Sequence, residues 1–222
     1  MQPDAPLAQG IALVYAGESL LVLNKPSGLL CVPGKGEDKQ DCLSARVQER
    51  FADALVVHRL GMATSGLVIM ARSSAAQRVL NDAFAAREVH KRYVAVVHGA
   101  AAVSDPPDTW QTIDLPILVD WPNRPMRKID HANGKPSTTR WRCVASDANT
   151  NTSRLELEPL TGRSHQLRIH LREIGHPILG DTLYAPPGVA AASPRLLLHA
   201  TELALKHPVT GHLMHWDCPP DF

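Results

Sequence analysis

Three segments of the sequence contain residue types that can support catalysis or substrate binding. Residues 56–72 form a polar loop that leads into an apolar stretch of strand length, and exposed loops held by buried strands often carry functional sites. Residues 159–181 place Arg163 at the start of an expected helix, whose free amides and dipole attract anions. The third segment surrounds Tyr93. Each also has an ordinary interpretation, because surface arginines form salt bridges and a tyrosine in a strand is most often core.

Several common kinds of site are excluded by spacing. Gly61 and Gly66 match the G-x-x-x-x-G pattern of a P-loop, but Leu67 follows where the phosphate-binding lysine is required. His165 and His170 are five residues apart, so they do not share a helix face as zinc ligands do. The four cysteines include no C-x-x-C pair, and we expect reduced, mostly buried thiols. The sequence therefore predicts a site without a metal.

Length and composition restrict the class of protein. The 222 residues are 44% hydrophobic and 20% charged, which is typical of globular proteins, and we expect one domain over residues 1–222. No apolar run reaches the roughly 18 to 20 residues that span a bilayer. The first seventeen residues carry no Lys or Arg of the kind that begins a signal peptide. We therefore expect a cytoplasmic chain without membrane contact.

The net charge of +1 conceals an uneven distribution along the chain. Residues 121–172 hold ten basic residues, among them Arg140 and Arg142, against four acidic ones. Such a basic stripe on an otherwise mildly acidic protein is typical of a face that binds the phosphates of a nucleic acid. The alternative interpretation is a solvated face of a sheet, and charge alone does not separate the two.

The elements that position these residues are predicted from periodicity and turn signals. Strands outnumber helices and arrive as hairpins, which favours an α+β fold with a largely antiparallel mixed sheet flanked by helices and loops. Helices are expected over residues 43–51, after the capping pair Ser73 and Ser74, and over residues 163–174. Strands are expected over residues 11–15, 19–24, 29–32, 66–72, 90–98, 138–145, 153–158, 196–198 and 202–205.

The order of the motifs resembles the RluA-type pseudouridine synthases over nearly the whole chain. LVLNKPSGLLCVPG at residues 21–34 is similar to the first motif of that family, HRLGMATSGLVIMAR at 58–72 to its catalytic loop and strand, and KRYVAVVHG at 91–99 to its tyrosine strand. GRSHQLRIHL and GHPILGD are similar to its arginine segment. DWPNRP and GKPSTTRWR resemble, more narrowly, the dual-specificity branch that modifies 23S rRNA and the tRNA anticodon stem-loop. No RNA-binding module is expected before the first motif.

This resemblance implies a pseudouridine synthase fold and an isomerase that detaches uracil from ribose and rejoins it through carbon, without cofactor or metal. It implies that Arg163 pairs with a catalytic aspartate, that Tyr93 stacks on the uracil and that Leu167 packs beside it. Since the uridine must be flipped out of its stack, Arg59 is expected to fill the vacated place. His58 and Thr64 are also expected to bind substrate, and Arg140 and Arg142 are expected to do so as part of the basic stripe that would hold the RNA stem. The expected partner is structured RNA, and the chain is expected to be a monomer.

The sequence departs from the family at the catalytic position. The motif calls for H-R-L-D, whereas this chain reads His58-Arg59-Leu60-Gly61, so glycine occupies the place of the aspartate. Glycine cannot replace a carboxylate that acts on the sugar. The resemblance therefore predicts a chain that is nearly inactive as written. The alternative is a non-catalytic RNA-binding or RNA-remodelling protein on the same fold.

Overall fold

The computed structural model describes residues 10–222, which separate into two compact units. The first unit contains residues 10–91 and 199–221, and the second contains residues 92–198 and Phe222. The chain passes from one unit to the other within strand β5 and again at the start of strand β11. The expectation of a single domain stays a prediction.

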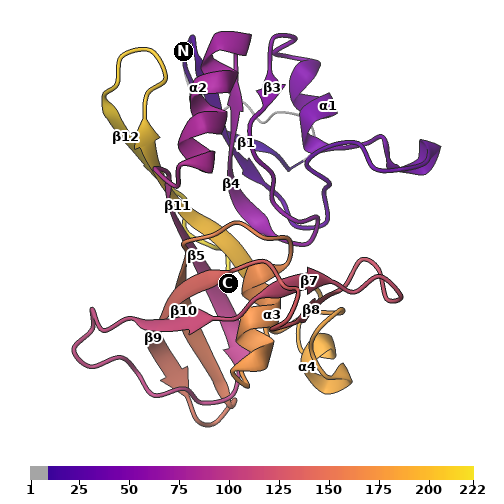
Figure 1. The fold of residues 1–222 in the computed structure, drawn as a ribbon, viewed down its shortest axis with the longest axis vertical. Coiled ribbons are helices and arrows are strands. Elements are labelled where there is room, and N and C mark those ends of the chain that lie inside the picture. The colour runs from indigo at the N-terminus through magenta and orange to yellow at the C-terminus, as the bar shows by residue number, and fades with distance from the viewer. Residues whose placement is uncertain (1–9) are drawn as a thin grey trace. The chain divides into compact units, whose positions relative to one another are not determined.

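The first unit is a sheet with helices and loops attached to it (Figure 1). Its strands are β1 (Ala12–Ala16), β2 (Leu20–Lys25), β3 (Leu55–Val56), β4 (Ser65–Ala71), most of β11 (Leu198–Lys206) and β12 (Leu213–Asp217). They are ordered β1-β2-β4-β11, with β3 paired to β4 and β12 to β11. β4 and β11 run parallel, and the other pairs are antiparallel. The helices are η1 (Glu37–Lys39), α1 (Leu43–Gln48) and α2 (Ser74–Ala85).

Strand β4 is the centre of this unit because all seven of its residues are buried. A continuous apolar run suits a strand that is covered on both faces. Helix α2 contacts β4, and its first turn is capped by Ser73, whose side chain accepts a hydrogen bond from the Ala76 amide at 3.1 Å. Leu80 of α2 joins the core around β4. The loop before β4, which carries position 61, is therefore attached to a rigid strand.

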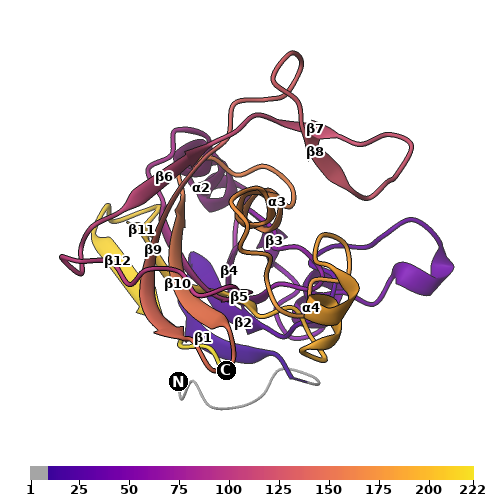
Figure 2. The ribbon, with the colours of Figure 1, turned by 90° about the horizontal axis from the view of Figure 1, so that it is seen from below.

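The second unit contains a sheet, a separate hairpin and two helices. Its sheet is ordered β5-β10-β9-β6, from β5 (His90–His98), β10 (Thr152–Pro159), β9 (Thr138–Asp147) and β6 (Gln111–Asp114). Strands β7 (Ile117–Val119) and β8 (Arg127–Ile129) form the hairpin, and the helices are α3 (Gln166–Glu173) and α4 (Pro187–Ala191). Helix α3 contacts β8, β9 and β10. Figure 2 shows that the β7–β8 hairpin projects away from the strands β5, β10 and β9.

The predicted α+β class with a largely antiparallel sheet is confirmed, and so is the predicted alternation in β9. Thr139, Trp141 and Cys143 point into the buried side of β9, while Arg140 and Arg142 are partly exposed. Two predictions of strands were wrong. Residues 29–32 form only a single bridge, between Leu30 and Cys42, because the segment bonds to Lys25 and to the first turn of α1 rather than to another strand. The two segments expected at 196–198 and 202–205 are not separate strands: Leu198 and residues 202–205 belong to one strand, β11, and residues 196–197 precede it.

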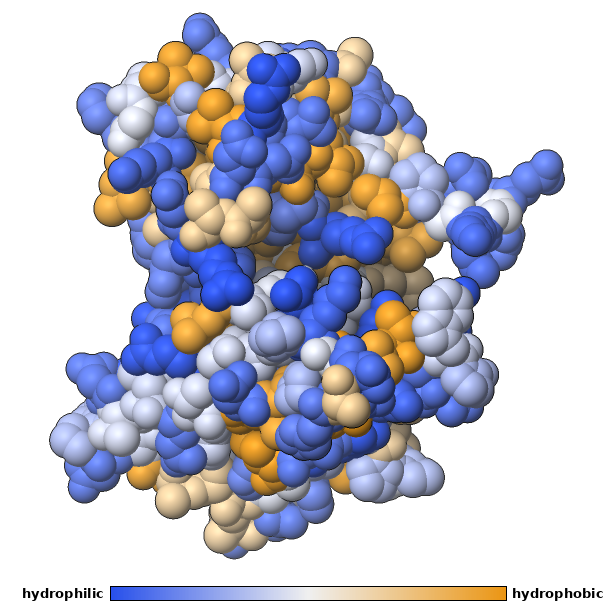
Figure 3. Space-filling view, viewed as in Figure 1, coloured by the Kyte–Doolittle hydropathy of each residue, from blue (hydrophilic) through white to orange (hydrophobic). Residues whose placement is uncertain are grey.

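Three features of the described residues agree with expectations from the composition: a hydrophilic surface loop, the character of the helices and the state of the cysteines. The loop that carries η1, at the right of the first unit in Figure 1, is hydrophilic in the space-filling view of Figure 3. No helix within residues 10–222 has the length and apolar character needed to cross a bilayer. All four cysteines are free and three are buried, as expected.

Candidate functional site

Position 61 lies in a loop of the first unit that has room for a larger residue. Gly61 is exposed, and its backbone does not adopt the left-handed conformation that would require glycine. A Cβ atom at this position would contact only the Thr64 Oγ1 atom, at 3.6 Å, which is an ordinary van der Waals distance. The Gly61 carbonyl accepts a hydrogen bond from the Thr64 amide at 3.1 Å and closes a turn. The fold therefore tolerates a side chain where the resemblance places an aspartate.

A fully buried lysine holds the loop that carries position 61. Lys25 donates from Nζ to the carbonyl oxygens of Pro26 at 2.7 Å, Leu29 at 2.8 Å and Met62 at 3.0 Å. Burial lowers the pKa of Lys25 to about 8, an effect that the neighbouring Cys31 thiol opposes. At pH 7 the ammonium group therefore keeps its three donors, and each of them has a carbonyl acceptor.

Two further hydrogen bonds connect the same two segments. Ser27 Oγ donates to the Ala63 carbonyl at 2.7 Å, and the Gly28 amide donates to the Met62 carbonyl at 2.9 Å. Residues 25–28 thus fix the backbone immediately after Gly61. Nothing in the local sequence pattern of residues 21–34 indicates that Lys25 enters the interior.

We expect Lys25→Met to destabilise the protein by about 2 kcal/mol, because it leaves buried carbonyl oxygens without donors. Hydrogen exchange of the amides in residues 60–64 should become faster, since the substitution releases this loop. Urea unfolding at pH 7 measures the first effect, with Lys35→Met as a control at an exposed lysine. A stability within about 0.5 kcal/mol of the unchanged protein would contradict this role of Lys25.

The other predicted residues of the loop differ in their surroundings. Arg59 is exposed, whereas Thr64 is buried. His58 is engaged by the protein itself: its Nε2 atom accepts a hydrogen bond from the Ile69 amide at 3.0 Å, and its ring stacks on Phe84 with centroids 4.5 Å apart. Burial, reinforced by the charge of a neighbouring lysine, lowers the pKa of His58 to about 3. His58 is therefore neutral and anchors the loop to β4, and its contact with substrate stays a prediction.

In the second unit, Arg163 precedes α3 and is positioned by a buried glutamine. Gln166 accepts hydrogen bonds at Oε1 from the Arg163 amide at 3.0 Å and from the Thr161 hydroxyl at 2.8 Å. Its Nε2 atom donates to the Thr138 carbonyl and the Thr139 hydroxyl, each at 3.0 Å. Gln166 thus joins the segment before α3 to strand β9, while the Arg163 side chain stays exposed.

The remaining predicted residues of this unit occupy α3 and β5. Leu167 is buried in the first turn of α3, and Tyr93 lies in β5 opposite Leu157 of β10 and is partly buried. Leu167 therefore lies in the helix that Arg163 precedes, four residues further along the chain. The predicted helix starts three residues later than expected, because His165 has a positive φ of 58° and interrupts the helical backbone.

His165 is held by a tyrosine that comes from a distant segment. The Tyr184 hydroxyl accepts a hydrogen bond from the Arg127 amide and donates to His165 Nδ1, both at 2.8 Å. Burial first, and then the charges of Arg168 and Arg127, lower the pKa of His165 to about 4. The ring is therefore neutral at pH 7, as an acceptor for the tyrosine must be.

The free energy of unfolding should decrease as the pH falls from 6.5 to about 4. Unfolded histidine binds a proton near pH 6.5, whereas folded His58 and His165 do so only near pH 3 and pH 4, so acid favours the unfolded chain. Each histidine should contribute a slope of about 1.4 kcal/mol per pH unit in this window. Urea unfolding at several pH values measures this slope. His165→Gln should reduce it while the exposed control His212→Gln should not, and equal slopes for all three proteins would contradict the assignment.

The two arginines predicted to bind RNA lie on β9 and are paired with acidic residues. Arg142 donates to Glu156 from Nε and Nη2 at 2.9 and 2.6 Å, and from Nη1 to Asp108 at 2.5 Å. Arg140 donates to Glu158 at 3.1 Å. Both glutamates lie directly opposite these arginines on β10. Cross-strand pairs of opposite charge stabilise a sheet.

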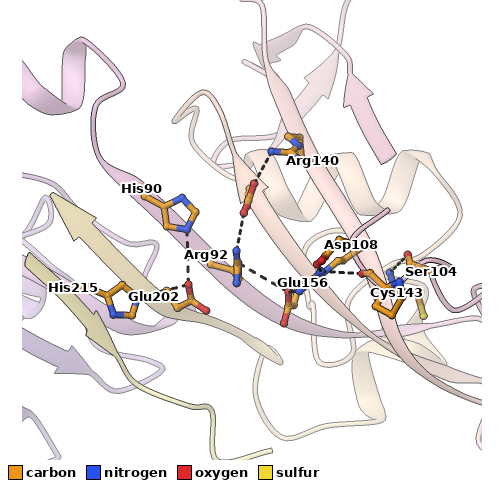
Figure 4. Close-up of polar contacts among 12 residues, drawn as sticks. His90, Arg92, Ser104, Asp108, Arg140, Cys143, Glu156, Glu202 and His215 are labelled. Carbon is orange, nitrogen blue, oxygen red and sulfur yellow. Dashed lines mark hydrogen bonds and ion pairs between the residues drawn. The ribbon is translucent and has the colours of Figure 1, made fainter. Parts of the chain in front are cut away.

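Arg92 adds a third arginine to this network (Figure 4). Arg92 of β5 donates to Glu158 at 3.0 Å, and the guanidinium groups of Arg92, Arg140 and Arg142 lie 5.7, 5.0 and 4.8 Å from the centre of the Trp110 ring. Three arginines here face three carboxylates, so the positive charges of Arg140 and Arg142 are balanced within this network. RNA binding by Arg140 and Arg142 stays a prediction.

Comparison with known proteins identifies the family. The model of the RNA pseudouridylate synthase family matches residues 19–173, and the chain belongs to this family. The dual-specificity RNA pseudouridine synthase RluA of Escherichia coli K12 is 45% identical over 219 residues, which cover 99% of this chain and 97% of that protein. The protein of the same name from Haemophilus influenzae is 43% identical over the same shares of both chains.

Solved structures show the same fold. Human RNA pseudouridylate synthase domain containing 1 is 27% identical, with a TM-score of 0.78 over 100% of this chain and 87% of that chain. Human RNA pseudouridylate synthase domain containing 4 is 23% identical, with a TM-score of 0.72 over 94% of this chain and 88% of that chain, and supports the fold alone. The predicted pseudouridine synthase fold and the predicted family are confirmed. The homologues are pseudouridine synthases, which are isomerases, as the predicted enzyme class requires.

Proposed function

We propose that this chain binds uridine in structured RNA through the apparatus of an RluA-type pseudouridine synthase, but lacks the acid that performs the isomerisation. The substrates proposed are 23S rRNA and the tRNA anticodon stem-loop, because the similar proteins from E. coli and H. influenzae are named dual-specificity RNA pseudouridine synthases. The observation that carries the proposal is Gly61, which stands in an H-R-L-D-type loop whose backbone needs no glycine.

The chemistry explains why one residue is decisive. Moving uracil from nitrogen to carbon attachment requires a carboxylate that acts on the sugar or takes up a proton. Glycine offers neither function, so the isomerisation is proposed to be lost or nearly lost in this chain. The roles that the resemblance implies for Arg163, Tyr93, Arg59 and Leu167 are carried into the proposal unchanged, as are those of His58, Thr64, Arg140 and Arg142.

The proposal includes the flipping of the target uridine out of its stack, because an enzyme cannot reach the reacting atoms inside a stacked loop. It assigns no cofactor and no metal. We propose further that the protein acts as a monomer in the cytoplasm, where rRNA and tRNA are present.

A second candidate is a non-catalytic RNA-binding or RNA-remodelling protein, which the absence of a carboxylate at position 61 favours. The two candidates differ in what an acid at this position does. Binding of an anticodon stem-loop RNA by the unchanged chain is expected for both. Formation of pseudouridine after Gly61→Asp, detected by carbodiimide modification and primer extension, supports a synthase that has lost its acid. Binding without pseudouridine in either protein supports the second candidate.

A further inference from the structure

The β7–β8 hairpin carries the side chain that is least expected on a protein surface. Trp121, in the loop between β7 and β8, is 66% exposed, and it is the only exposed aromatic residue in the part of the chain that the structure describes. Tryptophan usually buries most of its large ring. An exposed ring with no covering core therefore indicates a contact that the isolated chain does not supply.

The Trp121 ring is paired with an arginine from the same loop. The Arg124 guanidinium lies 3.3 Å from the centre of the ring, which is a close stacking distance for two planar groups. This contact covers one face of the ring while the side chain stays two-thirds exposed. A tryptophan stacked with an arginine presents a flat apolar surface beside a positive charge. Unpaired nucleobases stack on such platforms, and the charge suits the phosphates next to them.

The charges of the hairpin region favour the same partner. Residues 120–135 contain four basic residues against two aspartates, and Arg124, Lys128 and Lys135 are exposed. Asp120 accepts a hydrogen bond from Asn123, and Asp130 accepts the amides of residues 132 and 133 and an ion pair from Lys128. The excess of positive charge expected from the sequence thus remains in this region, whereas the arginines of β9 are balanced by carboxylates.

The hairpin is also continuous with the segment that holds Arg163. The backbone of Lys135 pairs with Ile117 of β7 in both directions, at 2.9 and 3.0 Å, and Arg163 Nε donates to the carbonyl of the next residue, Pro136, at 3.4 Å. Figure 2 shows the hairpin projecting from the sheet of the second unit. The hairpin that carries Trp121 is therefore joined, through residues 135 and 136, to the backbone that Arg163 contacts.

We propose that Trp121 and Arg124 form a stacking platform for an unpaired base of the RNA, separate from the flipped uridine. This inference rests on the proposed function, because it requires structured RNA as the partner. An unpaired base stacks on Trp121, and Arg124 supports the ring and neutralises a neighbouring phosphate. The platform gives the protein a preference for loops over continuous duplexes, since the bases of a duplex are already stacked.

The test compares two RNAs and two substitutions. The RNAs are an anticodon stem-loop and a blunt duplex with the same number of phosphates. Trp121→Ala should weaken binding of the stem-loop by about 10- to 100-fold, and Trp121→Phe should retain most of the affinity because a ring remains. Binding of the duplex should change little. Leu213→Ala, which truncates an exposed apolar residue of β12, serves as the matched control and should leave both affinities unchanged.

Two further measurements separate stacking from charge. Stem-loop RNA should quench the tryptophan fluorescence of the unchanged protein, and Trp121→Phe should remove most of this quenching. Arg124→Ala should reduce the slope of log affinity against log salt by about one unit, whereas the exposed control Arg78→Ala should not. Each of these results would support the platform.

The outcomes that overturn the inference are distinct from those that overturn the proposed function. If Trp121→Ala binds the stem-loop as tightly as the unchanged chain, or weakens stem-loop and duplex equally, the platform is wrong while RNA binding stands. If the unchanged chain binds neither RNA, both the inference and the proposed function fail.

Discussion

Gly61→Asp is expected to raise the rate of uridine isomerisation by a factor on the order of 10⁶, the loss seen when a covalent nucleophile is removed from an enzyme. The substitution supplies the carboxylate that the chemistry requires. It should not disturb the fold, because the backbone at Gly61 is not left-handed and a Cβ meets only the Thr64 hydroxyl at 3.6 Å. The surrounding loop is already fixed by Lys25, so the new side chain enters an ordered segment.

The measurement needs a control that separates the effect of the negative charge from the effect of adding a side chain of that size. Gly61→Asn adds a group of nearly the same size without the negative charge, and it should stay inactive. Release of the uracil C5 hydrogen as tritium, together with carbodiimide mapping, measures turnover in all three proteins. Activity in the unchanged chain equal to that of Gly61→Asp would show that another residue supplies the acid. Silence of Gly61→Asp, with RNA binding intact, would favour a non-catalytic protein.

The second large effect is expected at a buried ion pair of the second unit. Arg168 of α3 donates from Nε and Nη2 to the two carboxylate oxygens of Asp181, at 2.8 and 2.5 Å, and the side chains are 8% and 1% exposed. Asp181 Oδ1 also accepts the amides of Leu183 and Tyr184 at 3.0 and 3.1 Å. Because Tyr184 in turn holds His165, this carboxylate organises the start of α3.

Asp181→Asn should destabilise the protein by about 3 to 5 kcal/mol, because it leaves the Arg168 charge buried without a partner. Arg168→Met combined with Asp181→Asn should be less destabilising than Asp181→Asn alone, since the buried charge is then absent while the amide acceptor remains. Urea unfolding measures the free energy of unfolding of both variants and of the unchanged protein. Asp53→Asn, which breaks the more exposed pair with Arg72, should cost much less. A loss for Asp181→Asn no larger than that of this control would contradict the assignment.

Sequence alone was sufficient for features that depend on local order. The apolar run of β4, the serine cap of α2 and the alternating faces of β9 follow from patterns of neighbouring residues, and all three are confirmed. The same holds for the family, because its motifs occur in order along the chain and the family model matches residues 19–173. The glycine at position 61 is likewise read directly from the sequence.

Sequence alone did not indicate which polar residues enter the interior. Lys25 and Arg168 look like surface residues by type, yet one is fully buried against carbonyl oxygens and the other against Asp181. Their partners are distant in the chain or hidden in the backbone, so no local pattern shows them. The expected helix start at Arg163 failed for the same reason, since Tyr184 holds His165 from nineteen residues away.

The sequence by itself determined the class of this protein, the order of several of its elements and the glycine at position 61, because these depend on residue identity and periodicity. Only the tertiary structure decided which of its arginines are paired with carboxylates and which remain exposed. The register of β9 and β10 sets Arg140 and Arg142 opposite two glutamates, while Trp121 and Arg124 remain together on an exposed loop. A count of charges along the chain cannot separate these cases, because the electrostatic effect of an arginine depends on what lies within a few ångströms of it after folding.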